Sequence, residues 1–160
     1  MDPSRISLRP FKLSDVDDFL KWASDDRVTW DLRWNSITTR EEALEHLEKV
    51  AIPHPWRRSI CLDDRSIGYI SVWQFSGDAT EYWGQGIATV SVKMAVSRVF
   101  QDIPDLVRLE ALVEVENKGS QRVVEKVGFL KEGLLRKYTC CKGEIRDLFI
   151  YSFLSTDKVL

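Results

Sequence analysis

The chain has 160 residues, 44% of them hydrophobic and 30% charged, which is enough for a single domain over residues 1–160 with a sizeable buried core. Its formal net charge of −2 argues against nucleic acid as a partner, because nucleic-acid-binding domains usually present a basic face. No apolar run approaches the ~18 residues of a membrane span, and the polar start Met1-Asp2-Pro3-Ser4-Arg5 leads into no apolar stretch. We therefore expect a cytoplasmic protein with no signal peptide and no membrane partner.

Three cysteines and two histidines provide few metal ligands. Cys140 and Cys141 are adjacent, while Cys61, His46 and His54 stand elsewhere in the chain. Zinc sites generally need four ligands at recognisable spacing, and this set does not provide them. We therefore expect no metal, and reduced thiols that lie in a strand and a loop.

The first half of the chain changes between strand and helix patterns. It predicts, in order, a strand over 6–9, a helix that starts at Ser14, a helix that starts at Thr38 or Thr39, and a hairpin with strands over 59–62 and 67–73. Each helix start has a Ser or Thr that is followed three residues later by an acidic side chain, which is typical of a capped start. A polar turn over 63–66 joins the two hairpin strands.

The second half predicts more strands around two helices. The expected elements are a helix over 87–101, a strand over 106–115, a helix over 120–127, and two strands over 130–137 and 145–153. The last two strands are joined by a turn at Lys142-Gly143, and Gly128 is the expected end of the short helix. Strands before, between and after helices, without strict β-α-β alternation, indicate an α+β or mixed-sheet domain.

The segment Gly84-Gln85-Gly86, before the longer of these helices, is the strongest candidate for binding chemistry. Two glycines let the backbone approach a ligand closely, because no Cβ is in the way. The helix that begins at Ile87 leaves its first N–H groups without intrahelical partners, and these donors attract anions together with the positive end of the helix dipole. The matching ligand group is a phosphate or pyrophosphate.

Other interpretations of this turn stay open from the residues alone. A plain tight turn before a helix would have the same glycines. The segment is not a P-loop, since no Lys followed by Ser or Thr stands at the required spacing. It also lacks the third glycine of the dinucleotide fingerprint, near whose place Ser91-Val92 stands.

Motifs over nearly the whole chain add to this turn. They are Trp83-Gly84-Gln85-Gly86-Ile87-Ala88-Thr89, Asn117-Lys118-Gly119-Ser120, Glu125-Lys126-Val127-Gly128-Phe129, and Glu132-Gly133-Leu134-Leu135-Arg136 with Gly143 and Asp147. Together they resemble the GNAT acetyltransferases, and within them the RimJ/RimL-like branch in its plant-type stand-alone form. The first motif is similar to the family's cofactor motif Gln/Arg-x-x-Gly-x-Gly/Ala, with Trp83 in the first position.

The resemblance implies a GNAT fold of the α+β class, with a mixed twisted sheet that is splayed at its middle and has helices on both faces. It implies acetyl-CoA as the acetyl donor, with the pyrophosphate on the glycine turn and no metal. The cofactor-binding residues implied by the resemblance are Trp83, Gly84, Gln85, Gly86, Ile87, Ala88, Thr89, Asn117 and Ser120.

Two residues are implied to be catalytic. By the resemblance, Asn117 would hold the cofactor arm or a water, and Ser120 would stand near the thioester sulfur as proton donor to the leaving thiolate. Alternatives stay open, since Ser120 is also a natural N-cap and Asn117 could simply shape the turn. The family builds its acceptor side where Trp30, Trp34 and Trp56 stand, and core packing is the alternative for each tryptophan.

The general base of the family has no clear counterpart. Some members have a glutamate proposed as base between the last two strands, but the corresponding position around Thr139 has no carboxylate. Glu114, Glu116 and Asp147 are substitutes, although each is more often a solvated or structural charge. We assign no base.

A second departure concerns the strand before Trp83. Only residues 75–82 stand where the fold needs two turns and a strand, and even fully extended they span about 27 Å. We therefore expect that one central strand is missing, with a break near 77–80. Two explanations stay open: a segment of the parent protein is absent from this sequence, or the protein truly lacks the strand.

These observations predict an acetyl-CoA-dependent N-acetyltransferase, an acyltransferase that acts on a primary amine by direct attack in a ternary complex. The acceptor is a protein N-terminus or a small molecule, and the protein is expected to be a monomer or a homodimer. A coenzyme A-binding module with little or no catalytic turnover is the alternative, because the base and the strand are both missing.

Overall fold

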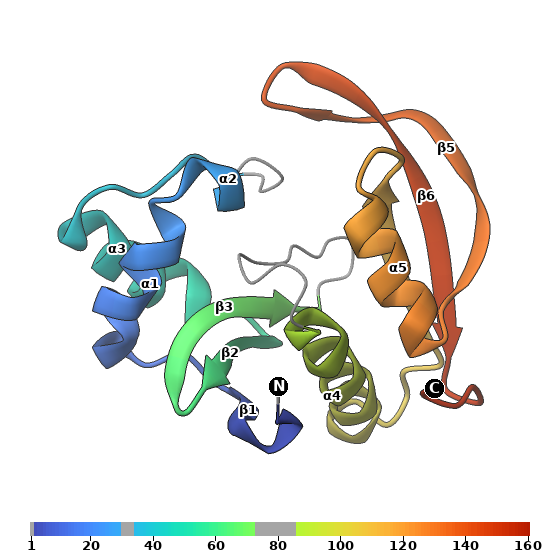
Figure 1. The fold of residues 1–160 in the computed structure, drawn as a ribbon, viewed down its shortest axis with the longest axis horizontal. Coiled ribbons are helices and arrows are strands. Elements are labelled where there is room, and N and C mark those ends of the chain that lie inside the picture. The colour runs from blue at the N-terminus through green and yellow to red at the C-terminus, as the bar shows by residue number, and fades with distance from the viewer. Residues whose placement is uncertain (1, 30–33, 73–85) are drawn as a thin grey trace. The chain divides into compact units, whose positions relative to one another are not determined.

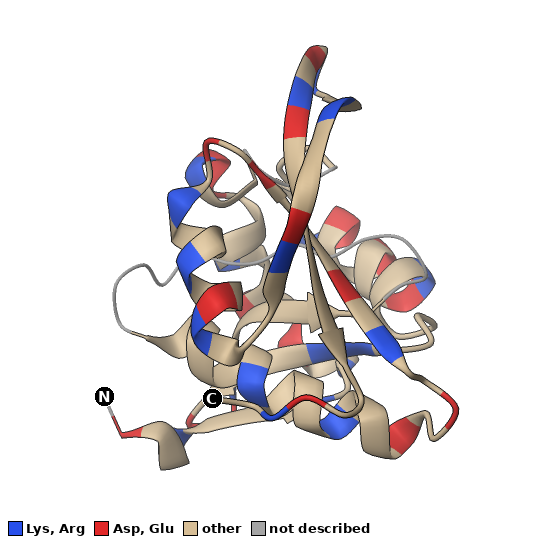
Figure 2. Ribbon diagram, turned by 90° about the vertical axis from the view of Figure 1, so that its right-hand side faces the viewer, with Lys and Arg blue, Asp and Glu red and all other residues tan. Residues whose placement is uncertain are grey.

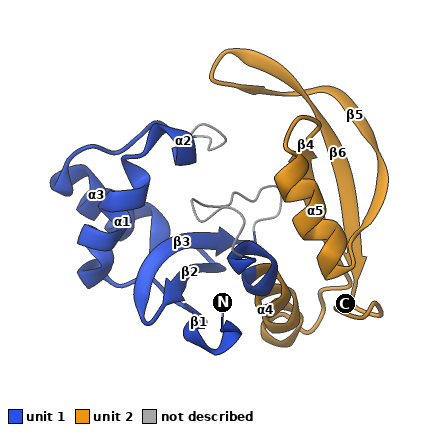
Figure 3. Ribbon diagram, in the orientation of Figure 1, with its two compact units in different colours: residues 1–91 blue, residues 92–160 orange. Residues whose placement is uncertain are grey.

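The computed structural model of the protein describes residues 2–29, 34–72 and 86–160 (Figure 1), and its chain divides into two compact units (Figure 3). Unit 1 spans Met1–Ser91 and unit 2 spans Val92–Leu160. Each unit combines helices with an antiparallel three-stranded sheet. The α+β class predicted from the sequence is thereby confirmed.

Three short strands form the sheet of unit 1 in the order β1-β2-β3. They are β1 (Ile6–Arg9), β2 (Arg57–Leu62) and β3 (Arg65–Ser71). Asp63 and Asp64 alone join β2 to β3, and both have positive φ, 50° and 65°. Two positive φ angles define the type I′ turn that two-residue hairpins favour, so the predicted hairpin is confirmed with a turn shorter than expected.

The helices of unit 1 are short. They are α1 (Val16–Ala23), α2 (Asp26–Thr29) and α3 (Arg40–His46), with 3₁₀ turns over Pro3–Arg5 and Leu13–Asp15 and a π-helical turn over Leu47–Ala51. Thr39 caps α3, because its Oγ1 accepts the Glu42 N–H at 3.2 Å and the Glu42 carboxylate accepts the Thr39 N–H at 3.3 Å. Of the two threonines considered as helix start, Thr39 is therefore the cap.

The start of α1 was predicted at Ser14, and this is wrong. A 3₁₀ turn precedes the helix, and the Asp15 carboxylate accepts the Lys12 N–H at 2.9 Å. The same carboxylate binds Arg9, whose Nη1 and Nη2 each donate at 2.8 Å. This paired geometry is the strong form of an ion pair, and its side chains are only 17% and 7% exposed. Arg9 therefore ties β1 to the first turn of α1.

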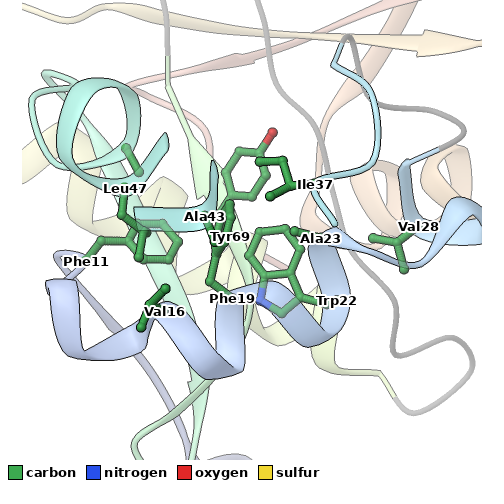
Figure 4. Close-up of a cluster of buried hydrophobic side chains, with 11 residues drawn as sticks. Phe11, Val16, Phe19, Trp22, Ala23, Val28, Ile37, Ala43, Leu47 and Tyr69 are labelled. Atoms are coloured by element: carbon green, nitrogen blue, oxygen red, sulfur yellow. The ribbon is translucent and has the colours of Figure 1, made fainter. Parts of the chain in front are cut away.

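A cluster of buried apolar side chains joins α1 to α3 and β3 within unit 1 (Figure 4). The rings of Phe19 and Trp22 meet edge to face with centroids 4.6 Å apart, and Tyr69 stacks 5.9 Å from Trp22. Each such pair adds about 0.5–1.5 kcal/mol beyond its buried area. The cluster consists of Phe11, Val16, Phe19, Trp22, Ala23, Val28, Ile37, Ala43, Leu47, Ala51 and Tyr69.

Unit 2 contains the second sheet, in the order β4-β6-β5 and again antiparallel. Its elements are β4 (Arg108–Glu114), α5 (Lys118–Val127), β5 (Leu130–Cys141) and β6 (Glu144–Leu154), and α4 (Ile87–Asp102) runs from unit 1 into unit 2. The predicted elements of this half are confirmed, although β4 starts two residues later than expected. None of the helices in the described ranges is long and apolar enough to cross a membrane.

The β5–β6 hairpin carries both signs of charge along its length (Figure 2). Its turn at Lys142-Gly143 is as predicted, with positive φ at both residues, 48° and 83°. The register slips between Leu135 and Thr139, where β5 bulges. Lys137 in this bulge has a φ of 50°, and its N–H donates to Asp147 Oδ1 at 2.7 Å. Asp147 therefore stabilises an irregular backbone.

Two predictions about the fold fall on residues 73–85. These are the missing central strand before Trp83 and the break near 77–80, and both lie outside the described residues. The strand pairs of the described ranges are all antiparallel. The mixed sheet that is splayed at its middle, with helices on both faces, would depend on how the two units join, and it stays a prediction.

Gly128, which ends α5, provides a test of the packing in unit 2. Its φ is 111°, and an added Cβ would lie 3.1 Å from the Lys158 carbonyl oxygen and 3.3 Å from the Leu160 side chain. We expect Gly128→Ala to lower the free energy of unfolding by about 1–3 kcal/mol, because backbone strain and crowding act together. Gly133→Ala is the control, since its Cβ would meet only Ile150 at an ordinary 3.8 Å. Equal stability of the two variants in urea unfolding would contradict this explanation.

Candidate functional site

The first turn of α4 contains the described residues of the predicted glycine-turn site, namely Gly86 to Thr89. Gly86 precedes the helix with a φ of 78°, and its carbonyl accepts the Val90 N–H at 3.1 Å, so helical hydrogen bonding begins here. The N–H groups of Ile87, Ala88 and Thr89 lie in the turn for which an α-helix supplies no acceptor. The helix dipole places partial positive charge at the same end. This turn has the features of an anion site.

The described residues leave open space beside Gly86. This glycine is exposed, and a Cβ added to it would meet no atom of the described residues within 4 Å. Ile87 is only 3% exposed, so its side chain is buried at the start of the helix. Three further predicted members of this site, Trp83, Gly84 and Gln85, lie outside the described residues. The described residues therefore offer backbone donors and the half-buried Thr89, whose side chain adds one hydroxyl.

Asn117 and Ser120 lie together at the start of α5. Asn117 is the N-cap, because its Oδ1 accepts the Ser120 N–H at 2.9 Å. The interpretation that Ser120 caps the helix is therefore wrong, and the interpretation that Asn117 shapes the turn is confirmed. Ser120 is the third helical residue and half-buried, and its hydroxyl has no hydrogen-bond partner within residues 2–29, 34–72 and 86–160.

Gln121, the fourth residue of α5, was not predicted from the sequence. It is 6% exposed, and its Nε2 donates to the carbonyl oxygens of Glu114 at 3.1 Å and Val115 at 2.8 Å. The sequence did contain a signal, since Gln121, Val124 and Val127 are the buried positions of this helix at a spacing of three. A glutamine within an apolar stripe indicates a specific hydrogen-bond partner.

Two of the three carboxylates considered as base, Glu114 and Asp147, have structural partners. Arg146 Nη1 donates to both carboxylate oxygens of Glu114 at 2.7 Å, and the side chains of this pair are 12% and 21% exposed. The Asp147 carboxylate accepts the N–H of Lys137 in the β5 bulge at 2.7 Å. Glu116 is exposed to solvent. Among the described residues, the carboxylates of Glu114 and Asp147 are therefore engaged within the fold, and we assign no base.

Trp34 belongs to the aromatic group of unit 1. Its ring stacks on Phe19 with centroids 6.3 Å apart, and it lies 5.3 Å from the ring of His46. Burial lowers the pKa of His46 to about 4, and the positive charge of Arg57 contributes. The imidazole is therefore neutral at pH 7 and packs as an aromatic ring.

Trp56 is only 3% exposed, and the guanidinium of Arg58 lies 4.8 Å from its ring centre. This environment is that of a core residue with one cationic neighbour. Trp30 lies outside the described residues. Contact with an acceptor stays a prediction for all three tryptophans.

The three cysteines are free thiols, with Cys61 and Cys141 buried and Cys140 exposed. Cys140 and Cys141 are the last two residues of β5, so the expectation that this pair lies in a loop is wrong. In the part of the chain that the structure describes, no three His, Cys, Asp or Glu side chains gather as a metal site would need.

Comparison with known proteins identifies the family. Residues 5–130 match the family model described as an acetyltransferase (GNAT) domain. The chain belongs to the GNAT family. The probable N-acetyltransferase YjcK of Bacillus subtilis (strain 168) is 30% identical in an alignment of 173 positions, and this alignment covers 95% of each protein.

Solved GNAT structures have the same fold. The crystal structure of a GNAT-family acetyltransferase from Bacillus anthracis superposes with a TM-score of 0.83 at 21% identity, over 96% of each chain. RimL, described as a ribosomal L7/L12 alpha-N-protein acetyltransferase and solved in complex with coenzyme A, gives a TM-score of 0.78 at 19% identity, over 94% of each chain. The predicted GNAT fold is confirmed, and the protein is an acetyl-CoA-dependent N-acetyltransferase.

The alignment of this GNAT chain with YjcK is relevant to the prediction that one strand is missing before Trp83. It runs over 173 positions, which is more than the 160 residues of this chain, so YjcK has residues with no counterpart here. This difference agrees with a segment that is shorter in this chain than in YjcK. That the residues of YjcK without a counterpart include the strand expected before Trp83 stays a prediction.

Proposed function

We propose that the protein acetylates the α-amine of a protein N-terminus, with a small primary amine as the second candidate acceptor. The amine attacks acetyl-CoA directly in a ternary complex, without an acetyl-enzyme. The protein acts as a single domain over residues 1–160, in the cytoplasm and within the RimJ/RimL-like branch. The likeness to RimL, which is described as an alpha-N-protein acetyltransferase, supports this acceptor class.

The first turn of α4 is proposed to hold the pyrophosphate of acetyl-CoA. Its features suit an anion, because backbone N–H groups and the positive helix end act together there. The open space above Gly86 suits a ligand that approaches the backbone closely. The motif residues Trp83, Gly84 and Gln85 complete this site in the proposal, and Thr89 adds its hydroxyl.

The Ser120 hydroxyl is proposed to assist the leaving group. The amine nitrogen attacks the thioester carbon, the carbon–sulfur bond breaks, and the thiolate takes the Ser120 proton while the nitrogen returns one to Ser120. One observation carries this proposal, namely that Asn117 caps α5 and leaves the Ser120 hydroxyl without a partner among the residues described. Asn117 is proposed to hold the cofactor arm or a water in addition.

The partners of the carboxylates favour an acceptor that needs little help to lose a proton. Glu114 is paired with Arg146, and Asp147 is bound to a backbone N–H. An α-amine has a pKa of about 8 and is partly neutral at pH 7, whereas a lysine amine with a pKa of about 10.4 is almost entirely charged. A site to which we assign no base among the described residues therefore suits the α-amine. Trp30, Trp34 and Trp56 are proposed for the acceptor side.

The acceptor class is tested by measuring the free thiol of the coenzyme A that acetyl transfer releases from acetyl-CoA. We expect release with a lysine-free peptide that has a free N-terminus. We expect about 100-fold slower release at pH 7 with an N-acetylated peptide that contains lysine, because less of that amine is neutral. A small primary amine completes the panel. Tight coenzyme A binding without thiol release from any acceptor would contradict the proposal and favour the binding module.

The cofactor turn is tested by a matched pair of glycine substitutions. Gly86 and Gly143 have similar φ angles, 78° and 83°, and at both an added Cβ meets no atom of the residues that the structure describes within 4 Å. Both Gly→Ala variants should lose about 1–2 kcal/mol of unfolding free energy from backbone strain. Only Gly86→Ala should weaken coenzyme A binding in calorimetry, by about 10-fold or more, because its methyl group occupies the space of the pyrophosphate. Equal affinities would remove this turn from the site.

A further inference from the structure

We propose that Gln121 is a positioning residue for Ser120, acting through the backbone where β4 ends. This inference rests on the proposed function, in which the Ser120 hydroxyl assists the leaving thiolate. Gln121 follows Ser120 directly in α5, so any rotation of this helical turn moves both residues. The side chain of Gln121 is the part that is bound to the strand end.

The contacts of Gln121 reach across the turn between β4 and α5. Its Nε2 donates to the carbonyl oxygens of Glu114 at 3.1 Å and Val115 at 2.8 Å. Two nearby donors also bond to these carbonyls, the Asn117 N–H to Glu114 at 3.0 Å and Lys118 Nζ to Val115 at 2.6 Å. Those two donors come from the turn and from the first helical residue. Gln121 therefore connects the body of the helix to the strand.

The burial of this amide argues for a specific role. Gln121 is 6% exposed and occupies an apolar stripe with Val124 and Val127, where an aliphatic side chain would pack as well. Burying an amide is favourable only when its hydrogen bonds are made, and such bonds fix one arrangement of the groups that they join. The arrangement fixed here is the direction in which α5 leaves β4.

The direction in which α5 leaves β4 determines where the Ser120 hydroxyl lies. The Asn117 cap holds the Ser120 N–H at 2.9 Å, and the Gln121 N–H bonds to the Asn117 carbonyl at 3.1 Å, so the first turn behaves as one body. Its orientation relative to β4 is then governed by the Gln121 side chain. Both contacts of Nε2 are directed to backbone carbonyls, so Gln121 acts through Ser120 and not on the substrate.

The test is a double-mutant cycle on kcat with the full-length protein. Gln121→Met keeps the length of the side chain and removes its donors. We expect kcat to fall about 10-fold to 100-fold, as small misplacements of a catalytic group do, with the KM for acetyl-CoA unchanged. In the Ser120→Ala background the same substitution should have no further effect, because the group that it misplaces is gone. Gln101→Met, at an exposed position of α4, is the control and should leave kcat unchanged.

The outcomes separate this inference from the proposed function. A normal kcat for Ser120→Ala would overturn the proposed role of Ser120 itself. A reduced kcat for Ser120→Ala with a normal kcat for Gln121→Met would overturn only the role of Gln121. Equal losses from Gln121→Met in both backgrounds would also overturn it, since a purely structural effect is additive. If Gln121→Met does not fold, Gln121→Asn, whose shorter amide cannot reach both carbonyls, should show the same dependence on Ser120.

Discussion

The candidate catalytic residues depend on one hydrogen bond, from the Ser120 N–H to the Asn117 side chain at 2.9 Å. A helix start leaves N–H donors without partners, and asparagine is among the best side chains for accepting one of them. If Ser120 were the cap, its oxygen would be directed to the backbone of its own helix. Because Asn117 performs this task, Ser120 lies inside the first turn and keeps its hydroxyl for another group.

The same end of β4 shows how a described carboxylate that was considered as base is engaged within the fold. Glu114 supplies its side chain to Arg146 and its carbonyl oxygen to Gln121, so this residue holds strand and helix together. Asp147 is bound in the β5 bulge in a similar way. Both carboxylates are thus engaged by groups of the fold. The function that we propose for this GNAT site therefore uses an acceptor amine that is already partly neutral and a well-placed hydroxyl.

Local signals in the sequence predicted local structure well. The cap at Thr39 and the helix end at Gly128 followed from residue types at fixed spacing, since their partners are close in sequence. Features that depend on which of several possible partners a side chain chooses were missed. The helix start at Ser14 failed because Arg9 from β1 binds Asp15 and reorganises that turn. The motif located the Asn117–Ser120 turn, but which residue caps the helix and what supports the turn depend on contacts that only the folded chain reveals.

The central claim, that Asn117 caps the helix while Ser120 assists the reaction, is tested most directly by comparing two alanine variants. Unfolding in urea and kcat for acetyl transfer are measured for each. Asn117→Ala should lose about 0.5–2 kcal/mol of unfolding free energy, because the cap is removed. Ser120→Ala should stay within about 0.5 kcal/mol of the parent protein and lose most of its kcat. A Ser120→Ala variant that is as unstable as Asn117→Ala, or that keeps its full kcat, would contradict the claim.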